Sequence, residues 1–177
     1  MRTGKVVLSA TAGLATLVVL VLAVGFTLPE RHRATVRAQY RAPADVVYRT
    51  IIDVAAAPTW RTGVDSVQIL SEQPLTWREH SGGGTLTMEM VEASSTRVVS
   101  RIADTSQGFG GTWIFEVVPD AEGTTLTITE DGEVYNPLFR VMSRFVFGHY
   151  SGLERYAADL GTKFGENVQA VRVESLP

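Results

Sequence analysis

Three ionisable side chains stand within otherwise apolar patterns of this sequence, and together they could move protons. In "LTWREH", Glu79 continues the alternation that places Trp77 on one face of a strand, and Glu130 is in phase with Ile128 in the same way. His149 falls in the apolar series of a helix near the C-terminus. In one apolar cavity, burial would raise the pKa values of both carboxyl groups and permit acid–base catalysis. The alternative is that strand ends turn toward solvent, that a bulge reverses the alternation, or that the histidine only bonds to the backbone at a helix kink.

Other kinds of site lack the residues they need. The chain has no cysteine, which excludes disulfides, thiolate nucleophiles and cysteine-ligated zinc. His32, His80 and His149 do not have the spacing of metal ligands, so we expect neither a metal nor a cofactor. The glycine-rich segments "SGGGT" (81–85) and "GFGGT" (108–112) lack the lysine and the strand-to-helix context of a phosphate-binding loop. Both are predicted to be hairpin turns.

Large side chains that the patterns direct inward form a second group of candidates. Aromatic and methionine side chains suit an adaptable pocket for an apolar ligand, and they would equally fill a solid core. Trp60 follows a short helical segment, so it could seal the mouth of a cavity or lock that segment to a sheet. Its neighbour Arg61 is expected in solvent. The predicted cavity residues are Tyr48, Trp60, Trp77, Met88, Met90, Trp113, Phe115, Phe139, Phe145 and His149.

The elements that must position these residues begin with a strand and two short helices. In "ATVRAQYRA", Ala34, Val36, Ala38 and Tyr40 alternate with polar residues, as in a half-buried strand. "RAPADVVYRTIID" is predicted to be a helix, with its proline in the first turn, and "VAAAPTW" a second, shorter one.

A series of strands and one long helix follow. Between Asp65 and Val134 the pattern predicts six strands, which are "SVQIL", "LTWREH", "TLTMEM", "TRVVSRIAD", "GTWIFEVVP" and "TTLTITEDGEV". From Pro137 to Phe164, apolar residues recur at spacings of three and four, as in an amphipathic helix. Gly148 predicts a kink in that helix. An antiparallel sheet of this size has an apolar face that only the closing helix is large enough to cover.

The N-terminal segment predicts a membrane anchor. Residues 6–28 carry no charge, and as a helix they would span about 34 Å, enough for the hydrocarbon core of a bilayer. A cleaved signal peptide is the alternative, but its cleavage site would be the poor match "AVG". The short basic tail with Arg2 and Lys5 favours a single-pass topology with the domain on the extracytoplasmic side.

Composition limits the partners. Beyond Arg2 and Lys5 the chain has 19 acidic and 14 basic residues, and a net negative domain is a poor binder of nucleic acid. With 177 residues and 45% hydrophobic content, one globular domain with a sizeable core is expected.

Several segments resemble the START-like (SRPBCC) superfamily, which includes polyketide cyclase/dehydrase families. They are "APADVVYRTIIDVAAAPTW", "PLTWREH", "GGTWIFEVVP", "GTTLTITEDGEVYNP" and the closing helix, within residues 33–167. The resemblance implies an α+β helix-grip fold, in which a curved antiparallel sheet of about seven strands wraps around a long C-terminal helix, with two short helices after the first strand. The chain then divides into an anchor or signal peptide (1–29), a START-like domain (30–167) and a tail (168–177).

The resemblance also implies a cavity between sheet and helix. Members of this superfamily bind lipids, sterols or polyketides, and some catalyse cyclisation or dehydration. We therefore expect the domain to bind a hydrophobic small molecule or lipid beside the membrane. A cyclase or dehydratase that uses Glu79, Glu130 or His149 is the first alternative. A protein-interaction module with a filled core is the second. A cavity below about 300 Å³ would argue against ligand binding.

Overall fold

One large antiparallel sheet and a small set of helices make up the fold, which is α+β as predicted. The computed structural model describes residues 16–174 and begins with helical residues 16–27. The elements that follow are β1 (Arg31–Tyr40), α2 (Ala44–Ile52), η1 (Val54–Thr59), β2 (Ser66–Glu72), β3 (Leu75–Ser81), β4 (Gly84–Ser94), β5 (Arg97–Ile102), β6 (Phe109–Asp120), β7 (Gly123–Val134), α3 (Pro137–Met142), η2 (Ser143–Phe147), α4 (Ser151–Lys163) and β8 (Val171–Val173).

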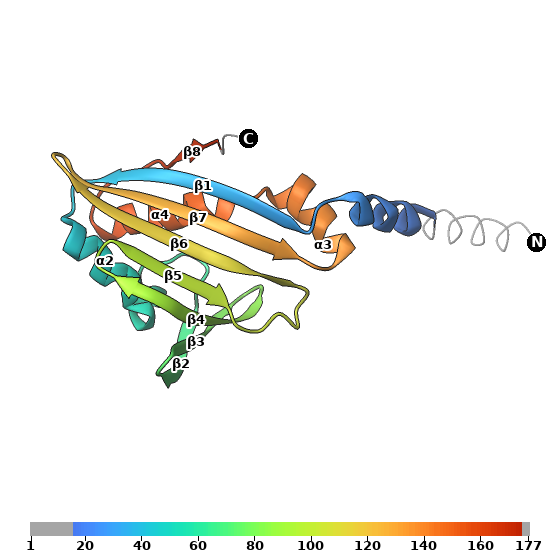
Figure 1. Ribbon diagram of the computed structural model, residues 1–177, viewed down its shortest axis with the longest axis horizontal. Coiled ribbons are helices and arrows are strands. Elements are labelled where there is room, and N and C mark those ends of the chain that lie inside the picture. Colours follow the sequence, from blue (N-terminus) through green and yellow to red (C-terminus); the bar gives the residue numbers. More distant parts are fainter. Residues whose placement is uncertain (1–15, 175–177) are drawn as a thin grey trace, which may run out of the picture.

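The sheet has eight strands in the order β2-β3-β4-β5-β6-β7-β1-β8, one more than predicted. Neighbouring strands along the chain pair as hairpins from β2 to β7, and β1 closes against β7. The additional strand, β8, pairs antiparallel with β1 (Figure 1). It lies in the segment predicted to be a tail, and its three residues are too few to produce a recognisable alternation.

The strand alternation predicted from the sequence is present in the core. Ala34, Val36, Ala38 and Tyr40 on β1 are all buried. The predicted strands all form, and the one bulge in β4 falls after Met90, where the register with β5 shifts. No register shift occurs between β3 and β4 or between β6 and β7. The alternation that carries Glu79 on β3 and Glu130 on β7 is therefore preserved.

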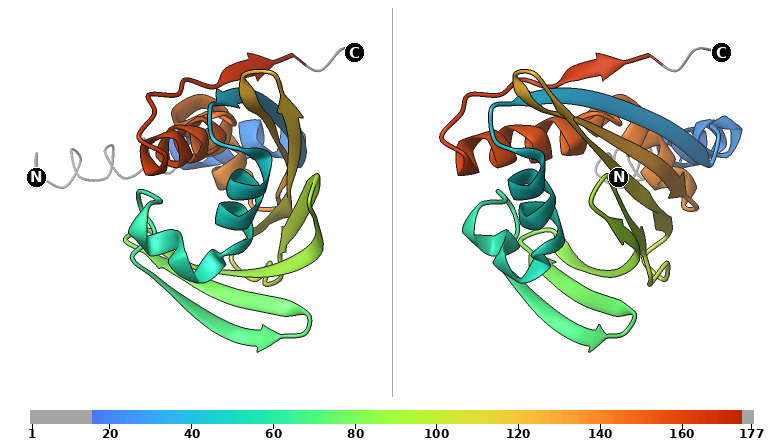
Figure 2. Two further views of the ribbon diagram at one scale, coloured as in Figure 1. Left: turned by 90° about the vertical axis from the view of Figure 1, so that its left-hand side faces the viewer. Right: turned by 60° about the vertical axis from the view of Figure 1, so that its left-hand side comes forward.

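The closing helix is not continuous. The structure divides it into α3, the π-helical η2 and α4, with a break at Gly148, which has a positive φ of 71°. Glycine adopts this conformation without the steric cost that other residues pay. The helix α4 lies across the concave side of the curved sheet (Figure 2) and buries Leu153, Tyr156 and Leu160.

The described part of the N-terminal segment is helical at 16–27 and packs against α3. A Cβ added to Gly25 would lie 2.2 Å from the carbonyl oxygen of Pro137, so only glycine permits this approach. Among residues 16–174, no helix combines the length and the hydropathy needed to cross a membrane. The predicted span 6–28 extends into residues 6–15, which lie outside the described part, so the anchor stays a prediction.

Candidate ligand-binding site

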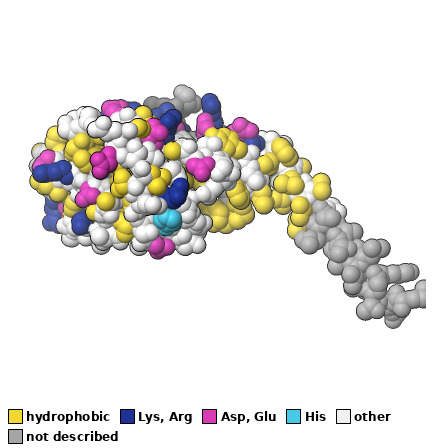
Figure 3. Space-filling view, turned by 90° about the horizontal axis from the view of Figure 1, so that it is seen from below, with side chains coloured by type: hydrophobic (Ala, Val, Ile, Leu, Met, Phe, Trp, Pro, Cys, Tyr) yellow, Lys and Arg dark blue, Asp and Glu magenta, His cyan; other side chains and the backbone are white. Residues whose placement is uncertain are grey.

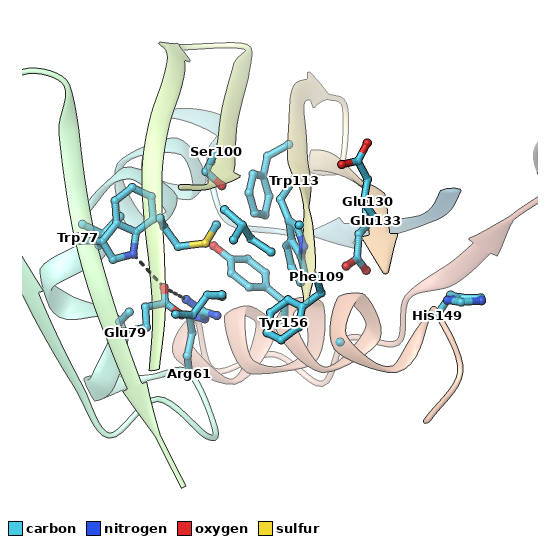
Figure 4. Close-up of a pocket in the computed structure, with 18 of the residues that line it drawn as sticks. Arg61, Trp77, Glu79, Ser100, Phe109, Trp113, Glu130, Glu133, His149 and Tyr156 are labelled. Carbon is cyan, nitrogen blue, oxygen red and sulfur yellow. Dashed lines mark hydrogen bonds and ion pairs between the residues drawn. The ribbon is translucent and has the colours of Figure 1, made fainter. Parts of the chain in front are cut away.

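A cavity of about 540 Å³ lies between the sheet and the α4 side of the fold (Figure 4). Its volume exceeds about 300 Å³, the lower end of the range for small-molecule sites. All three tryptophans of the chain line it. Of the ten predicted cavity residues, those on its wall are Trp60, Trp77, Met88, Met90, Trp113, Phe115, Phe139 and His149.

Two predicted cavity residues lie elsewhere. Tyr48, on α2, packs against the edge of the hydrophobic core and does not reach the cavity wall. Phe145, on η2, has 66% of its surface exposed. The physical reason for the second difference is the broken helix, because the change to π-helical geometry and the turn at Gly148 leave Phe145 pointing away from the face that α4 buries.

Tyr156 is the centre of the aromatic part of the wall. Its ring centroid lies 5.3 Å from that of Trp60, 6.0 Å from that of Trp113 and 5.1 Å from that of Phe115. Burial raises the pKa of its hydroxyl well above the ordinary value, so the phenol is neutral. Trp60 thus lines the cavity and also packs η1 against α4. The sequence had offered a cavity role and a packing role as alternatives, and the structure shows a contact of each kind.

A partly buried ion pair bounds one side of the cavity. The guanidinium of Arg61 donates to Oε1 of Glu79 at 2.7 Å, and the indole of Trp77 donates to the same oxygen at 3.0 Å. Arg61 also lies over the Tyr156 ring, 5.2 Å from its centroid. Only 24% of the Arg61 side chain is exposed, so the prediction that Arg61 lies in solvent was wrong. Glu79 is therefore held by two donors, an arrangement that suits positioning better than proton transfer.

Glu130 is the most perturbed carboxyl group of the cavity. Burial raises its pKa from 4.5 to about 7, and a hydrogen bond with Trp113 opposes that shift only in part. Trp113 is its direct partner across the β6–β7 ladder. A carboxyl group with a pKa near neutrality can either donate or accept a proton at physiological pH. Glu130 is thus the candidate residue with suitable acid–base properties.

Two histidines stack at the rim near η2. The imidazole rings of His32 and His149 are 3.9 Å apart between centroids and inclined by 25°, and Nδ1 of His149 lies 3.2 Å from Oγ of Ser143. Burial, and then the neighbouring His149, lower the pKa of His32 to about 4. Burial and Arg144 lower the pKa of His149. Both rings are therefore neutral at physiological pH.

The three predicted catalytic candidates share the cavity but not one point of it. Glu79 is on β3 and Glu130 on β7, four strand spacings apart, or roughly 19 Å along the curved sheet. Figure 4 shows Glu79 beside Trp77 and Arg61 on one side, with Glu130 on the other and His149 further out. No single substrate atom could meet all three groups.

Sequence reasoning missed His32 and Ser100 as cavity residues, although a signal existed. His32 is in phase with Ala34 and Val36, but the first strand was expected to begin only at Ala34. Ser100 is in phase with the buried Val98 on β5. The contact between His32 and His149 had no local signal, because 117 positions separate them in the chain.

The glycine-rich segments differ from one another in the structure. "SGGGT" forms the turn between β3 and β4, as predicted. "GFGGT" lies mainly in the first residues of β6, so its expected hairpin turn was wrong. Opposite it on β7, Gly132 leaves space for the His32 ring, which a Cβ would approach at 2.2 Å.

Within the described residues, no three histidine, aspartate or glutamate side chains lie close enough to hold a metal ion.

The comparisons with known proteins agree with this geometry. Residues 31–159 match the family model for "polyketide cyclase / dehydrase and lipid transport". The chain belongs to this polyketide cyclase/dehydrase and lipid transport family. A comparison with curated proteins found no match.

Solved structures of similar fold span several activities. A START superfamily protein from Mycobacterium smegmatis has a TM-score of 0.60 at 18% identity, covering 76% of this chain and 97% of that one. The Zhui aromatase/cyclase from Streptomyces sp. R1128 has a TM-score of 0.55 at 23% identity, covering 75% and 90%. Norcoclaurine synthase from Thalictrum flavum has a TM-score of 0.59 at 9% identity, covering 81% and 91%. At these identities the likeness concerns the fold, and function must be argued from the site.

Proposed function

We propose that this member of the family binds a hydrophobic small molecule or lipid in the cavity between the sheet and α4. The observation that carries the proposal is a cavity of about 540 Å³ whose wall is mostly aromatic, aliphatic and methionine side chains. Concave apolar sites of this size bind drug-sized ligands. The description of the family includes lipid transport, and its solved relatives include an aromatase/cyclase, which supports the same class of ligand.

The polar groups of the wall limit the ligand further. The Arg61–Glu79 pair lies on one side and Glu130 on the other, and Ser100 lies on the wall as well. A ligand with an apolar body and a few hydroxyl or carbonyl groups would satisfy them. A strongly anionic ligand would lie beside Glu79 and Glu130 and would be disfavoured.

We further propose that residues 6–28 tether the domain to a membrane, with the domain on the extracytoplasmic side. The segment is uncharged, and the described part of it is helical. Tethering would place the cavity next to the phase into which a hydrophobic ligand partitions.

Intrinsic fluorescence tests ligand binding, because all three tryptophans line the cavity. The full chain is titrated with a long-chain fatty alcohol, a sterol and a polycyclic aromatic ketone, and with a sugar of similar size as the polar control. We expect a saturable change in tryptophan emission for at least one apolar compound and none for the sugar. No saturable change with any apolar compound would contradict the proposal.

The pKa of Glu130 supports a second candidate function, cyclisation or dehydration of a polyketide-like substrate. Its pKa of about 7 in an apolar cavity suits a general acid or base. The Glu130→Gln variant should then retain ligand binding and lose turnover, by about 10²- to 10⁴-fold. Equal turnover in the variant and the wild type would exclude Glu130 as the proton-transfer group.

A further inference from the structure

Exposed apolar side chains are concentrated in two segments that lie beside each other. Of seventeen large hydrophobic residues exposed within 16–174, eleven fall in residues 16–27 and 138–147. Single exposed hydrophobic residues are ordinary, but a contiguous apolar surface marks an interaction site. We call the part on α3 and η2 the apolar collar, and its members are Leu138, Phe139, Phe145, Val146 and Phe147.

A buried arginine joins the two segments. Arg140, with 7% of its side chain exposed, donates to the carbonyl oxygens of Gly25 and Leu28 at 3.5 and 3.4 Å and to Oε1 of Glu30 at 2.5 Å. It thereby satisfies carbonyl groups at the C-terminal end of the helix and places its charge where the helix dipole favours a cation. The helix and the collar consequently form one surface, and Figure 3 shows hydrophobic side chains gathered where the domain meets the helix.

The collar also borders the cavity. Phe139 and Phe147 line the cavity and are 41% and 64% exposed, so the cavity reaches the molecular surface between them. Phe145 and Val146 are more than 60% exposed and do not line the cavity. No residue of η2 is buried, so this segment is not part of the packed core.

We propose that the apolar collar docks into the interfacial layer of a lipid bilayer and that the cavity takes up its ligand through this docked surface. The proposal rests on the proposed function of the cavity as a hydrophobic ligand site. The preceding chain is uncharged from residue 6 to residue 28, so the apolar surface continues toward the N-terminus in sequence. Arg144 lies within the collar segment, is exposed and forms no ion pair among the described residues. A cation beside an apolar face adds attraction to anionic lipid headgroups.

A site-specific fluorescent label tests the docking. Because the chain has no cysteine of its own, Phe145→Cys gives one unique position for a nitrobenzoxadiazole label, and Val118→Cys, on β6 and 53% exposed before substitution, gives the control. The labelled full-length proteins are incorporated into vesicles of phosphatidylcholine and phosphatidylglycerol with brominated acyl chains. We expect bromine to quench the label at position 145 and not the label at position 118.

Two results would overturn the docking. One is the absence of quenching at position 145. The other is a blue-shifted, unquenched label whose signal grows with protein concentration, because a second copy of the chain would then cover the collar. Bromine quenching together with a lack of ligand binding in the tryptophan titration would leave the docking intact and contradict the proposed function. Ligand binding without bromine quenching would leave the proposed function intact and contradict the docking.

A second variant tests the route of uptake. Phe145→Ser with Val146→Ser removes apolar surface without touching the cavity wall, and Val91→Ser with Val118→Ser is the matched control on β4 and β6. We expect the collar variant to take up a fluorescent sterol from the same vesicles about tenfold more slowly, with unchanged equilibrium affinity, since it loses favourable burial in lipid. Uptake at the wild-type rate would show that the ligand does not enter through the collar.

Discussion

At the scale of single residues, burial in the cavity wall sets the protonation of its ionisable groups. Glu130, His32 and Tyr156 are each shifted toward the neutral form, with burial as the first cause. On the wall, the charge of Arg61 is balanced by that of Glu79, with which it forms an ion pair. Burial thus lowers the charge on part of the wall, which favours binding of an apolar ligand, although Asp53 and Glu133 also line the cavity.

Glu130 should make stability depend on pH. Its pKa is about 7 in the folded state and near 4.5 when unfolded, so its protonated form favours the folded state below pH 4.5, and that contribution disappears as the pH rises to about 7. The Glu130→Gln variant lacks this loss and should be more stable than the wild type at pH 8, by on the order of 2 kcal/mol. Urea unfolding at pH 5 and pH 8 measures the difference. Glu116→Gln, at an exposed position on β6, is the control and should show no comparable gain.

The histidine stack predicts coupled titration. Burial is the main cause of the low pKa of His32, and His149 is the second. His149→Gln should therefore raise the pKa of His32 above 4 while leaving it below 6.5, as measured by NMR of the imidazole C–H groups. Since the folded-state pKa of His32 is depressed, its contribution to stability is present above pH 6.5 and falls as the pH drops toward 4. An unchanged pKa of His32 in the variant would show that the rings do not interact.

At the scale of elements, the strands were predictable from the sequence and the closing helix was predictable only in part. Alternation in β1 and β7 reports burial directly, because each strand has one face on the core. Gly148 indicated an interruption, but not that η2 would turn Phe145 outward. The π-helical segment contacts mainly α3 and buries none of its residues, so no burial pattern in the sequence records which way Phe145 turns.

The link between the N-terminal helix and the domain depends on Arg140. Besides the helix carbonyls, its guanidinium donates to the carbonyl oxygens of Val134 and Tyr135 at 2.8 and 3.0 Å. Arg140→Ala should destabilise the fold by about 2–4 kcal/mol, because it leaves buried acceptors without donors. Hydrogen exchange of the amides in residues 16–30 should accelerate as well. Arg144→Ala, which removes an exposed and unpaired arginine, should change neither quantity.

At the scale of the whole molecule, the sequence predicted the architecture and left open whether the interior is hollow. The same aromatic and methionine residues would build a filled core or a cavity wall, since the difference depends on how far α4 stands from the sheet. That distance is set by contacts between distant residues, such as the hydrogen bond from the Tyr40 hydroxyl to the carbonyl oxygen of Ala157 at 2.9 Å. The cavity of about 540 Å³ argues against an interaction module with a filled core.

A cavity-filling variant provides the most direct test of ligand binding. Ser100 lies on the cavity wall and is 6% exposed, so Ser100→Phe should place a ring in the space that a ligand would use. Ser66→Phe, at an exposed position on β2, adds the same ring outside the cavity. Overpacking can cost about 1–3 kcal/mol, so thermal unfolding is measured first to establish that Ser100→Phe is folded.

The decisive measurement is native mass spectrometry of the full chain released from a mild detergent, with organic extraction of whatever molecule it retains. The wild type and Ser66→Phe should carry an apolar molecule of defined mass, and folded Ser100→Phe should carry none. A wild-type protein that retains nothing, even after incubation with lipids and polyketides, would contradict the account. So would a molecule that folded Ser100→Phe retains equally well.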